Sequence, residues 1–433
     1  MIKEIINFII FQILDQAPIF LGIIALFGLL VQKKDINEIF DGVVKTIVGL
    51  IILGLGAGAI VSSISPVMGM LNSVVHVDGV MPLNEAAFGV AMLKIADQAV
   101  LTFIIGFIIH LILVYLIPWK ICKNVYLTAH MMLYLSIFLV LSLNNVLGLT
   151  GITLTLVSSI FAALYWTFTP AIPRILGRKF AGDDFTLGHA EQFGTLIGAL
   201  VGKLFGKAEE NDADKIELPG GLSLFQDVTL ALAVIMPILY IVIGIIVGSD
   251  NVYTLSQSQN WIIWLIMQAI SFTAGVAVML VGVRMFLNSI IPAFKGISEK
   301  IIPNSIAALD CPVYYPYSSS GAMMGFLGSI PAGILVTLIL VACKSSVIVF
   351  PSPIILFFDG CTVGVFGNKY GGWKGALCGG FISSFIAHLG SAALYPLMGL
   401  LYGSGVMFSN IDYAVLWLPI LYILKLIRPI LGI

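Results

Sequence analysis

Two stretches decide the fold that this sequence predicts: V-M-P-L-N-E-A-A-F-G at 80–89 and I-P-N-S-I-A-A-L-D-C-P at 302–312. Each is a mostly apolar segment that is interrupted by proline and carries one acidic residue. Proline breaks helices, and broken helix ends are tolerated at membrane depth only where they face protein or water. We therefore interpret both stretches as re-entrant hairpins that dip into a membrane, with surface loops at headgroup level as the alternative.

The composition indicates that lipid is the solvent for most of the chain. Of the 433 residues, 59% are apolar and only 10% are charged, whereas a soluble domain carries about 25% charged residues. The formal net charge of −1 provides no basic field for nucleic acid. The five cysteines show no C-x-x-C spacing, and no Walker, metal-ligand or nucleophile motif is present. We expect no cofactor, no metal and no catalytic residue of the chain's own.

Eleven apolar stretches approach the roughly 20 residues that a spanning helix needs. They are 12–31, 43–64, 95–117, 125–146, 151–172, 228–248, 261–288, 322–343, 348–366, 375–400 and 413–430. With the N-terminus outside, the outer connections 65–79, 249–260 and 401–412 contain no Lys or Arg, and most of these basic residues lie inside. Because cytoplasmic loops hold the excess of Lys and Arg, we expect an outer N-terminus and an inner C-terminus.

The two halves of the chain resemble each other at a shift of 226 residues, which aligns Gly49 with Gly275, Gly56 with Gly282, Pro66 with Pro292, and Asn84-Glu85 with Asp310-Cys311. The matched segments run in opposite directions in the predicted topology, as in the inverted repeats of many transporters. We predict an all-α polytopic membrane protein made of inverted repeats 1–217 and 218–433. The hydrophilic stretch 203–217 is interpreted as a cytoplasmic linker, and it could also dock a soluble partner.

Carboxylates in the two hairpins are candidates for a binding site. An ionised side chain at membrane depth is costly unless it is paired or hydrated, and is therefore a functional candidate by default. Asp310 in the second hairpin and Glu85 in the first meet this condition, and Asn84 lies beside Glu85.

Two histidines add hydrogen-bonding groups of the kind that bind sugars. His130 lies in L-T-A-H-M-M, and His189 lies in F-T-L-G-H-A-E-Q-F with Glu191 and Gln192 within one turn. A neutral imidazole both donates and accepts hydrogen bonds, which suits the hydroxyl groups of a polyol. The alternative is a helix-packing histidine that is bonded to a backbone carbonyl.

Six motifs occur together in one known family. They are L-T-x-H at 127–130, F-x-x-G-H-x-x-Q-F at 185–193, G-V-R-M-F at 282–286, A-F-x-G-I-S-x-K-I-I-P at 293–303, A-L-D-C at 308–311 and T-V-G-V-F-G-N-K-Y-G-G-W-K-G-A-L at 362–377. The chain resembles the membrane-spanning IIC component of the ascorbate-type bacterial phosphotransferase system (PTS), within the ascorbate–galactitol superfamily.

The resemblance implies a homodimer in the bacterial inner (cytoplasmic) membrane, with eleven spans in each protomer. A scaffold domain would form the dimer, and a moving core domain would carry the substrate past it in elevator fashion. A soluble IIB partner, supplied with phosphate by IIA and phosphoenolpyruvate, would phosphorylate the sugar or sugar acid at the inner face. The chain would then be the transport component of a phosphotransferase complex whose phosphoryl transfer is performed by its partners.

The resemblance also assigns substrate-binding residues and shows where this chain departs from the family. His130, His189, Gln192 and Asp310 match the family motifs and would line the substrate site. Ascorbate-type members have glutamines where this chain has Tyr134 and Leu135, Thr-Tyr where it has Asn84-Glu85, and Gln-Gln-Gln where it has Ala190, Glu191 and Gln192. The two extra carboxylates would repel an anionic ligand and favour a neutral sugar or polyol, although ascorbate remains the first candidate.

A rival class of function fits part of the same pattern. An ion-coupled secondary transporter would use Glu85 and Asp310 as ligands for protons or sodium, and it would share the inverted repeats. A channel or a purely structural membrane protein is a third possibility, against which the two acidic hairpins argue. The motif series is the feature that favours the PTS permease.

Overall fold

The computed structural model describes residues 16–75, 79–215, 228–256, 259–300 and 302–431. The first half contains α2 (Ala17–Val31), α3 (Ile36–Val75), β1 (Gly79–Pro82), α4 (Asn84–Leu116), η2 (Lys120–Cys122), β2 (Asn124–Tyr126), α5 (Ala129–Leu147), α6 (Gly151–Phe168), α7 (Ala171–Ala181), β3 (Phe185–Leu187), α8 (Gln192–Phe205), α9 (Ala208–Asn211) and η3 (Ala213–Lys215).

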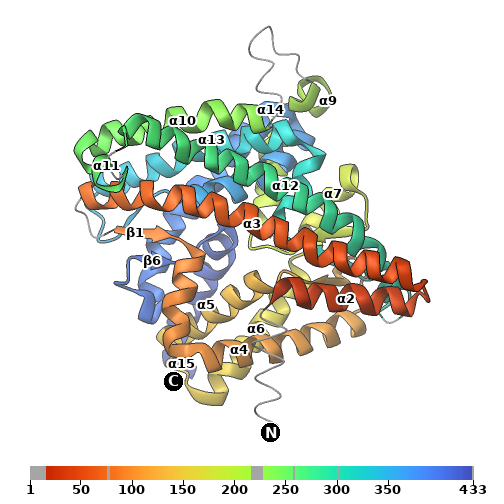
Figure 1. Cartoon of the computed structure of the whole chain (residues 1–433). Helices are drawn as coiled ribbons and strands as arrows, with labels where there is room; N and C mark the ends of the chain where they lie inside the picture. Colours follow the sequence, from red (N-terminus) through yellow and green to blue (C-terminus); the bar gives the residue numbers. More distant parts are fainter. Residues whose placement is uncertain (1–15, 76–78, 216–227, 257–258, 301, 432–433) are drawn as a thin grey trace.

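The second half is as helical as the first. It contains α10 (Val228–Val247), α11 (Ser249–Ser256), α12 (Trp261–Lys300), β4 (Ile306–Leu309), η5 (Cys311–Tyr317), α13 (Ser319–Ala342), β5 (Ile348–Val349), α14 (Pro353–Leu394), η6 (Tyr395–Leu397), η7 (Gly399–Leu401), β6 (Val406–Met407), the π-helix η8 (Tyr413–Trp417) and α15 (Leu418–Leu431). Figure 1 shows these helices packed around the short strands. The expectation of a mainly α-helical membrane protein is confirmed at this level.

Seven helices of the described residues are long and apolar enough to cross a membrane, or eight if α10 and α11, bent by 115°, count as one span. Three differences explain why this number is smaller than the eleven predicted spans. The ranges 348–366 and 375–400 both lie in α14, which consists of two helices joined at a non-helical break at Gly372 (φ 73°) and is counted here as one. A methyl group added to Gly367 would meet the carbonyl oxygen of Gly375, so the two helices lie side by side, as the two expected ranges require. The described part of the first range, α2, has 15 residues, and the last range is divided between η8 and the 14-residue α15.

Two three-stranded parallel sheets support the hairpins. Their strand orders are β5-β1-β6 and β2-β4-β3, so each central strand is flanked by two strands from the other half of the chain. In the second sheet, Ala308 of β4 pairs with Tyr126 of β2 and Thr186 of β3. The backbone of β4 is thereby hydrogen-bonded on both sides, as non-helical chain would have to be at membrane depth.

Small residues allow the two longest matched helices, α3 and α12, to pack closely side by side (Figure 1). A methyl group added to Gly49 would meet the backbone of Phe286 and Gly282, and one added to Gly56 would meet the backbone of Met279 and Gly275. Close approach through small residues is how membrane helices gain packing energy where lipid supplies no hydrophobic driving force. The α3–α12 pair therefore depends on glycine at these positions.

Replacement of Gly56 by alanine tests this helix contact. The new methyl group would collide with the backbone of α12, and we expect Gly56→Ala to lower the stability of the purified protein by about 1–3 kcal/mol. Gly58→Ala is the matched control, because nothing lies within 4 Å of its added Cβ and alanine is the better helix former by about 1 kcal/mol. Thermal unfolding in detergent measures both. Equal melting temperatures for the two variants would show that the contact contributes little.

Candidate functional site

A cavity of about 350 Å³ lies between the helices α2 and α3 and the residues that directly follow β1 and β4. Its size is at the lower end of the roughly 300–1,000 Å³ typical of small-molecule sites. The side facing α2 and α3 is apolar and includes Pro18, Leu50 and Ile51. The opposite side carries polar groups from several elements: Asn84, His130, Tyr134, His189, Asp310 and Asn410.

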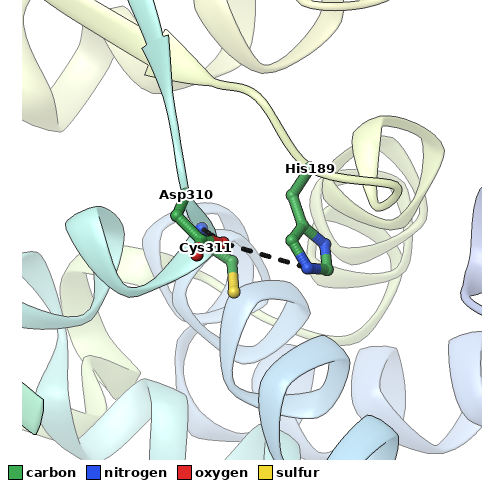
Figure 2. Close-up of side chains that lie close together, drawn as sticks. All are labelled: His189, Asp310 and Cys311. Atoms are coloured by element: carbon green, nitrogen blue, oxygen red, sulfur yellow. Dashed lines mark hydrogen bonds and ion pairs between the residues drawn. The ribbon is translucent and has the colours of Figure 1, made fainter. Parts of the chain in front are cut away.

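Asp310 is the acidic residue of this wall, and β4 and η5 fix its position. It follows the last residue of β4, and its Oδ1 accepts a 2.7 Å hydrogen bond from the backbone N–H of Cys311 at the start of η5. Its Oδ2 lies 3.6 Å from Nε2 of His130, and its Oδ1 lies 3.9 Å from Nε2 of His189. Figure 2 shows the His189 ring facing the carboxylate. These separations exceed a direct hydrogen bond, so the three groups are available to hydrogen-bond to the hydroxyls of a ligand.

The loop between β3 and α8 presents His189 to the cavity. Gln192 is fully buried and donates from Nε2 to the carbonyl oxygens of Leu187 (3.1 Å) and His189 (2.9 Å). The carboxylate of Asp412 accepts hydrogen bonds from the backbone N–H groups of Gln192 and Phe193, both 2.9 Å. Asp412 therefore caps the N-terminus of α8, a favourable place for a negative charge, and Gln192 shapes the loop from within.

Asn84 joins the first hairpin to the segment that follows β6. Its side chain donates to Oδ1 of Asn410 (3.0 Å) and accepts from the backbone N–H of Ser409 (3.0 Å). Asn410 in turn donates to Oδ1 of Asp359 in α14 (2.6 Å). The two halves of the chain are thus connected by side-chain hydrogen bonds directly at the cavity.

Aromatic rings complete the polar wall. Tyr134 lies one turn after His130 in α5, and the two rings form an edge-to-face pair with centroids 5.7 Å apart. Its ring also lies 5.7 Å from that of Phe408. Such ring pairs stabilise packing beyond what their buried area provides. Here they fix the position of the Tyr134 ring in the cavity wall next to the imidazole of His130.

The structure brings five of the eight residues predicted from the sequence to the cavity: Asn84, His130, Tyr134, His189 and Asp310. Glu191 and Gln192 are fully buried and do not belong to the described lining. The side chain of Glu85 lies outside the described part of the structure. The sequence reasoning missed three polar residues, Asp359, Asn410 and Asp412. Their signal was present in F-F-D-G at 357–360 and F-S-N-I-D at 408–412, where polar side chains interrupt apolar chain.

Two groups of residues have ligand atoms close enough to hold a cation. In each group the atoms lie within 4.8 Å of one another: His189 with Asp310 and Cys311, and His189 with Glu191 and Asp359. The two groups share one imidazole, and Oδ1 of Asp310 already accepts from the backbone of Cys311. This geometry by itself assigns no metal.

Arg174 of α7 holds the strand that leads to His130. The guanidinium is 1% exposed and donates to Asp183 (2.7 Å), to the carbonyl oxygen of Lys120 (2.8 Å) and to Oδ1 of Asn124 in β2 (2.9 Å). Partial burial alone would raise the pKa of the Asp183 carboxyl. Hydrogen bonds and positive charge from Arg174 and Arg178 outweigh that effect and hold this pKa below its ordinary value.

Helices of membrane-spanning length around a solute-sized cavity with one polar wall define a polytopic membrane protein that binds a small polar solute. The comparison with known families agrees. The chain matches the family described as the PTS system sugar-specific permease component (EIIC-GAT) over residues 12–412, and it belongs to this family. The family resemblance recognised from the six motifs is confirmed.

One curated relative is the ascorbate-specific PTS system EIIC component of Mycoplasma pneumoniae (strain ATCC 29342 / M129 / Subtype 1). It is 28% identical to this chain over 415 residues. The alignment covers 84% of this chain and 62% of the relative, so the chain spans less than two thirds of the relative's length.

Arg174 and Arg178 provide a matched test of the support behind the site. Both pair with Asp183, but Arg174 is buried and Arg178 is 44% exposed. We expect Arg174→Met to destabilise the purified protein by about 1.5–3 kcal/mol, because hydrogen bonds to a charged group are lost, and Arg178→Met by about 0–1 kcal/mol.

Thermal unfolding over a range of pH measures both effects. The Arg174 effect should shrink as the pH falls through the lowered pKa of Asp183, because the neutral acid no longer pairs with the guanidinium. Equal destabilisation by the two variants would contradict the structural role of Arg174.

Proposed function

We propose that this chain is the IIC sugar permease of a phosphoenolpyruvate-dependent PTS and imports L-ascorbate or a related sugar or polyol. The observation that carries the proposal is the polar wall formed by His130, His189 and Asp310 in a cavity of solute size. A carboxylate accepts hydrogen bonds from sugar hydroxyls, and each imidazole can donate or accept. Family membership adds a sugar as the class of solute.

Ascorbate stands first among the candidate substrates for two reasons. The relative from Mycoplasma pneumoniae is named as ascorbate-specific. In addition, Asp310 is the only acidic residue in the described lining of the cavity. Glu191 does not line the cavity and would therefore not contact an anionic ligand directly. A neutral sugar or polyol remains the alternative within the same function.

The division of the cavity into an apolar and a polar wall supports an elevator mechanism. The apolar wall belongs to α2 and α3, which we assign to the scaffold together with α10 and α12, and the polar wall belongs to the moving core. A solute that is hydrogen-bonded only to the core can move past Leu50 and Ile51 without breaking those bonds. The mutual exchange of strands between the two sheets supports inverted repeats 1–217 and 218–433 with two re-entrant hairpins.

The partners follow from the same proposal. Soluble PTS IIB and IIA proteins would supply the phosphate at the inner face, and the chain would function as a homodimer in the bacterial inner membrane. The N-terminus would lie outside and the C-terminus inside, because this arrangement keeps Lys and Arg in the inner connections.

Transport assays in membrane vesicles test the function. With phosphoenolpyruvate and the soluble PTS proteins supplied, labelled ascorbate should enter and appear inside as a phosphorylated product. Asp310→Asn keeps the size of the side chain but removes its charge, and a charge-assisted hydrogen bond contributes about 1.5–3 kcal/mol. We expect ascorbate affinity to fall roughly 10- to 100-fold, measured as equilibrium binding to the purified variant.

Further measurements distinguish a PTS permease from an ion-coupled secondary transporter. Arg178→Met alters an exposed ion pair far from the cavity lining and should bind ascorbate as the unmodified protein does. Accumulation of unmodified solute without phosphoenolpyruvate, abolished by a protonophore, would establish an ion-coupled transporter instead. Unchanged binding by a folded Asp310→Asn protein would reduce Asp310 to a structural residue.

Single cysteines at exposed positions test the orientation. In a background without the five native cysteines, Asp250→Cys in α11 should react with a membrane-impermeant maleimide from outside. Glu209→Cys in α9 should react only after the membrane is opened. Labelling of Glu209→Cys in intact cells would reverse the topology and remove the support that orientation gives to the inverted repeats.

A further inference from the structure

A pair of buried carboxyl groups lies behind the polar wall of the cavity. Glu191 directly precedes α8 and Asp359 lies in α14, with 0% and 2% of the side chains exposed. A nitrogen of His189 and one oxygen from each acid lie within 4.8 Å of one another. Neither acid belongs to the described lining of the cavity, so this pair is separate from the groups that would contact a solute.

The two acids differ in the hydrogen bonds they receive. Asp359 accepts from Nδ2 of Asn410 (2.6 Å) and from the backbone N–H of Ile411 (3.2 Å). Neither carboxyl oxygen of Glu191 has a donor, and the nearby hydroxyl of Thr362 donates instead to the carbonyl oxygen of Phe358. Hydrogen bonds to a carboxylate favour its charged form. The surroundings therefore stabilise a charge on Asp359 and leave a charge on Glu191 without support.

The other titratable groups around the pair do not supply a compensating positive charge. Those that face it from the neighbouring elements are His189, Asp310, Cys311, Tyr315, Cys361, Asp412 and Tyr413. Among the described residues, the only ion-pair partner of Glu191 is His189, at 3.4 Å. Two adjacent buried carboxylates without a cation are unfavourable, whereas one proton between them removes a charge and adds a donor.

We propose that Glu191 and Asp359 share one proton and form a proton-binding site directly behind the cavity, from which Glu191 orients the imidazole of His189. The proton resides on Glu191, whose O–H donates to the carboxylate of Asp359. Asp359 keeps its charge with the help of Asn410 and Ile411.

The shared proton also determines which ring nitrogen of His189 carries its hydrogen and which one faces the cavity as an acceptor. Nδ1 of His189 is buried, has no other hydrogen-bond partner and lies 3.4 Å from Oε1 of Glu191. The carbonyl oxygen of the protonated acid accepts from Nδ1–H, which leaves Nε2 as an acceptor on the cavity side, 3.9 Å from Asp310. A sugar hydroxyl can then donate to Nε2. This orienting role rests on the proposed function, whereas the shared proton does not.

Infrared spectroscopy of the purified protein tests the proton without any sugar. At neutral pH the spectrum should contain the C=O band of a protonated carboxylic acid. Glu191→Gln should remove intensity equal to one acid, and the exposed control Glu209→Gln should not. Absence of an acid band in the unmodified protein, or equal intensity in the unmodified protein and Glu191→Gln, overturns the proposal.

Thermal unfolding across pH provides a second measurement that needs no variant to fold. The folded protein would retain a proton that the unfolded chain releases at neutral pH, so stability falls as the pH rises. The melting temperature of the unmodified protein should fall with rising pH as long as the acid band persists, and the contribution of this site should level off once the band has disappeared. A band that stays constant until the protein unfolds also supports the site, and a band already absent at neutral pH contradicts it.

Sugar binding tests the orienting role. The amide of Glu191→Gln keeps a carbonyl for Nδ1–H and a donor for Asp359, whereas Glu191→Ala keeps neither. We expect Glu191→Ala to weaken ascorbate binding roughly 10-fold and Glu191→Gln to restore most of that loss. Equal weakening by both variants overturns the orienting role. If the unmodified protein binds no sugar, the proposed function fails while the infrared result still decides the proton site.

Discussion

The demand that backbone groups at membrane depth be hydrogen-bonded is the constraint on which this structure depends. The hairpin strands β1 and β4 are not helical, and each satisfies its N–H and C=O groups by lying between two strands of the opposite half. This arrangement places Asn84 directly after β1 and Asp310 directly after β4. The strand pairing that satisfies the backbone of β1 and β4 therefore also brings the polar side chains after them to the same cavity.

From these two points a polar network crosses the core between the halves. Asn84 bonds to Asn410 and Asn410 bonds to Asp359. Glu191 and His189 continue the series toward Asp310. Buried polar groups of this kind stabilise a structure only when their partners are present, so the network specifies how the two halves fit together. Across the cavity, the lining from α2 and α3 is apolar.

The proton proposed for Glu191 gives a physical account of the one member of this network that lacks a donor. A neutral acid donates and accepts, as an amide does, and so fits a site between a carboxylate and an imidazole. An ionised Glu191 would repel an anionic ligand. With a proton, it instead supports His189 and places no charge against ascorbate.

The sequence alone determined the membrane class and the family, and it singled out Asn84 and Asp310, which both line the cavity, because apolar length, motifs and broken segments are local properties. Tertiary structure decided the roles of Gln192, Asp359, Asn410 and Asp412. Their decisive bonds join residues far apart in the chain, as between Asn84 and Asn410, 326 positions apart, and between Gln192 and Asp412, 220 apart. It also decided that the helices before and after Gly372 fold back against each other, with Gly367 next to Gly375. These partners come together because strands and helices from the two halves of the chain pack against each other. Local sequence patterns do not encode that packing.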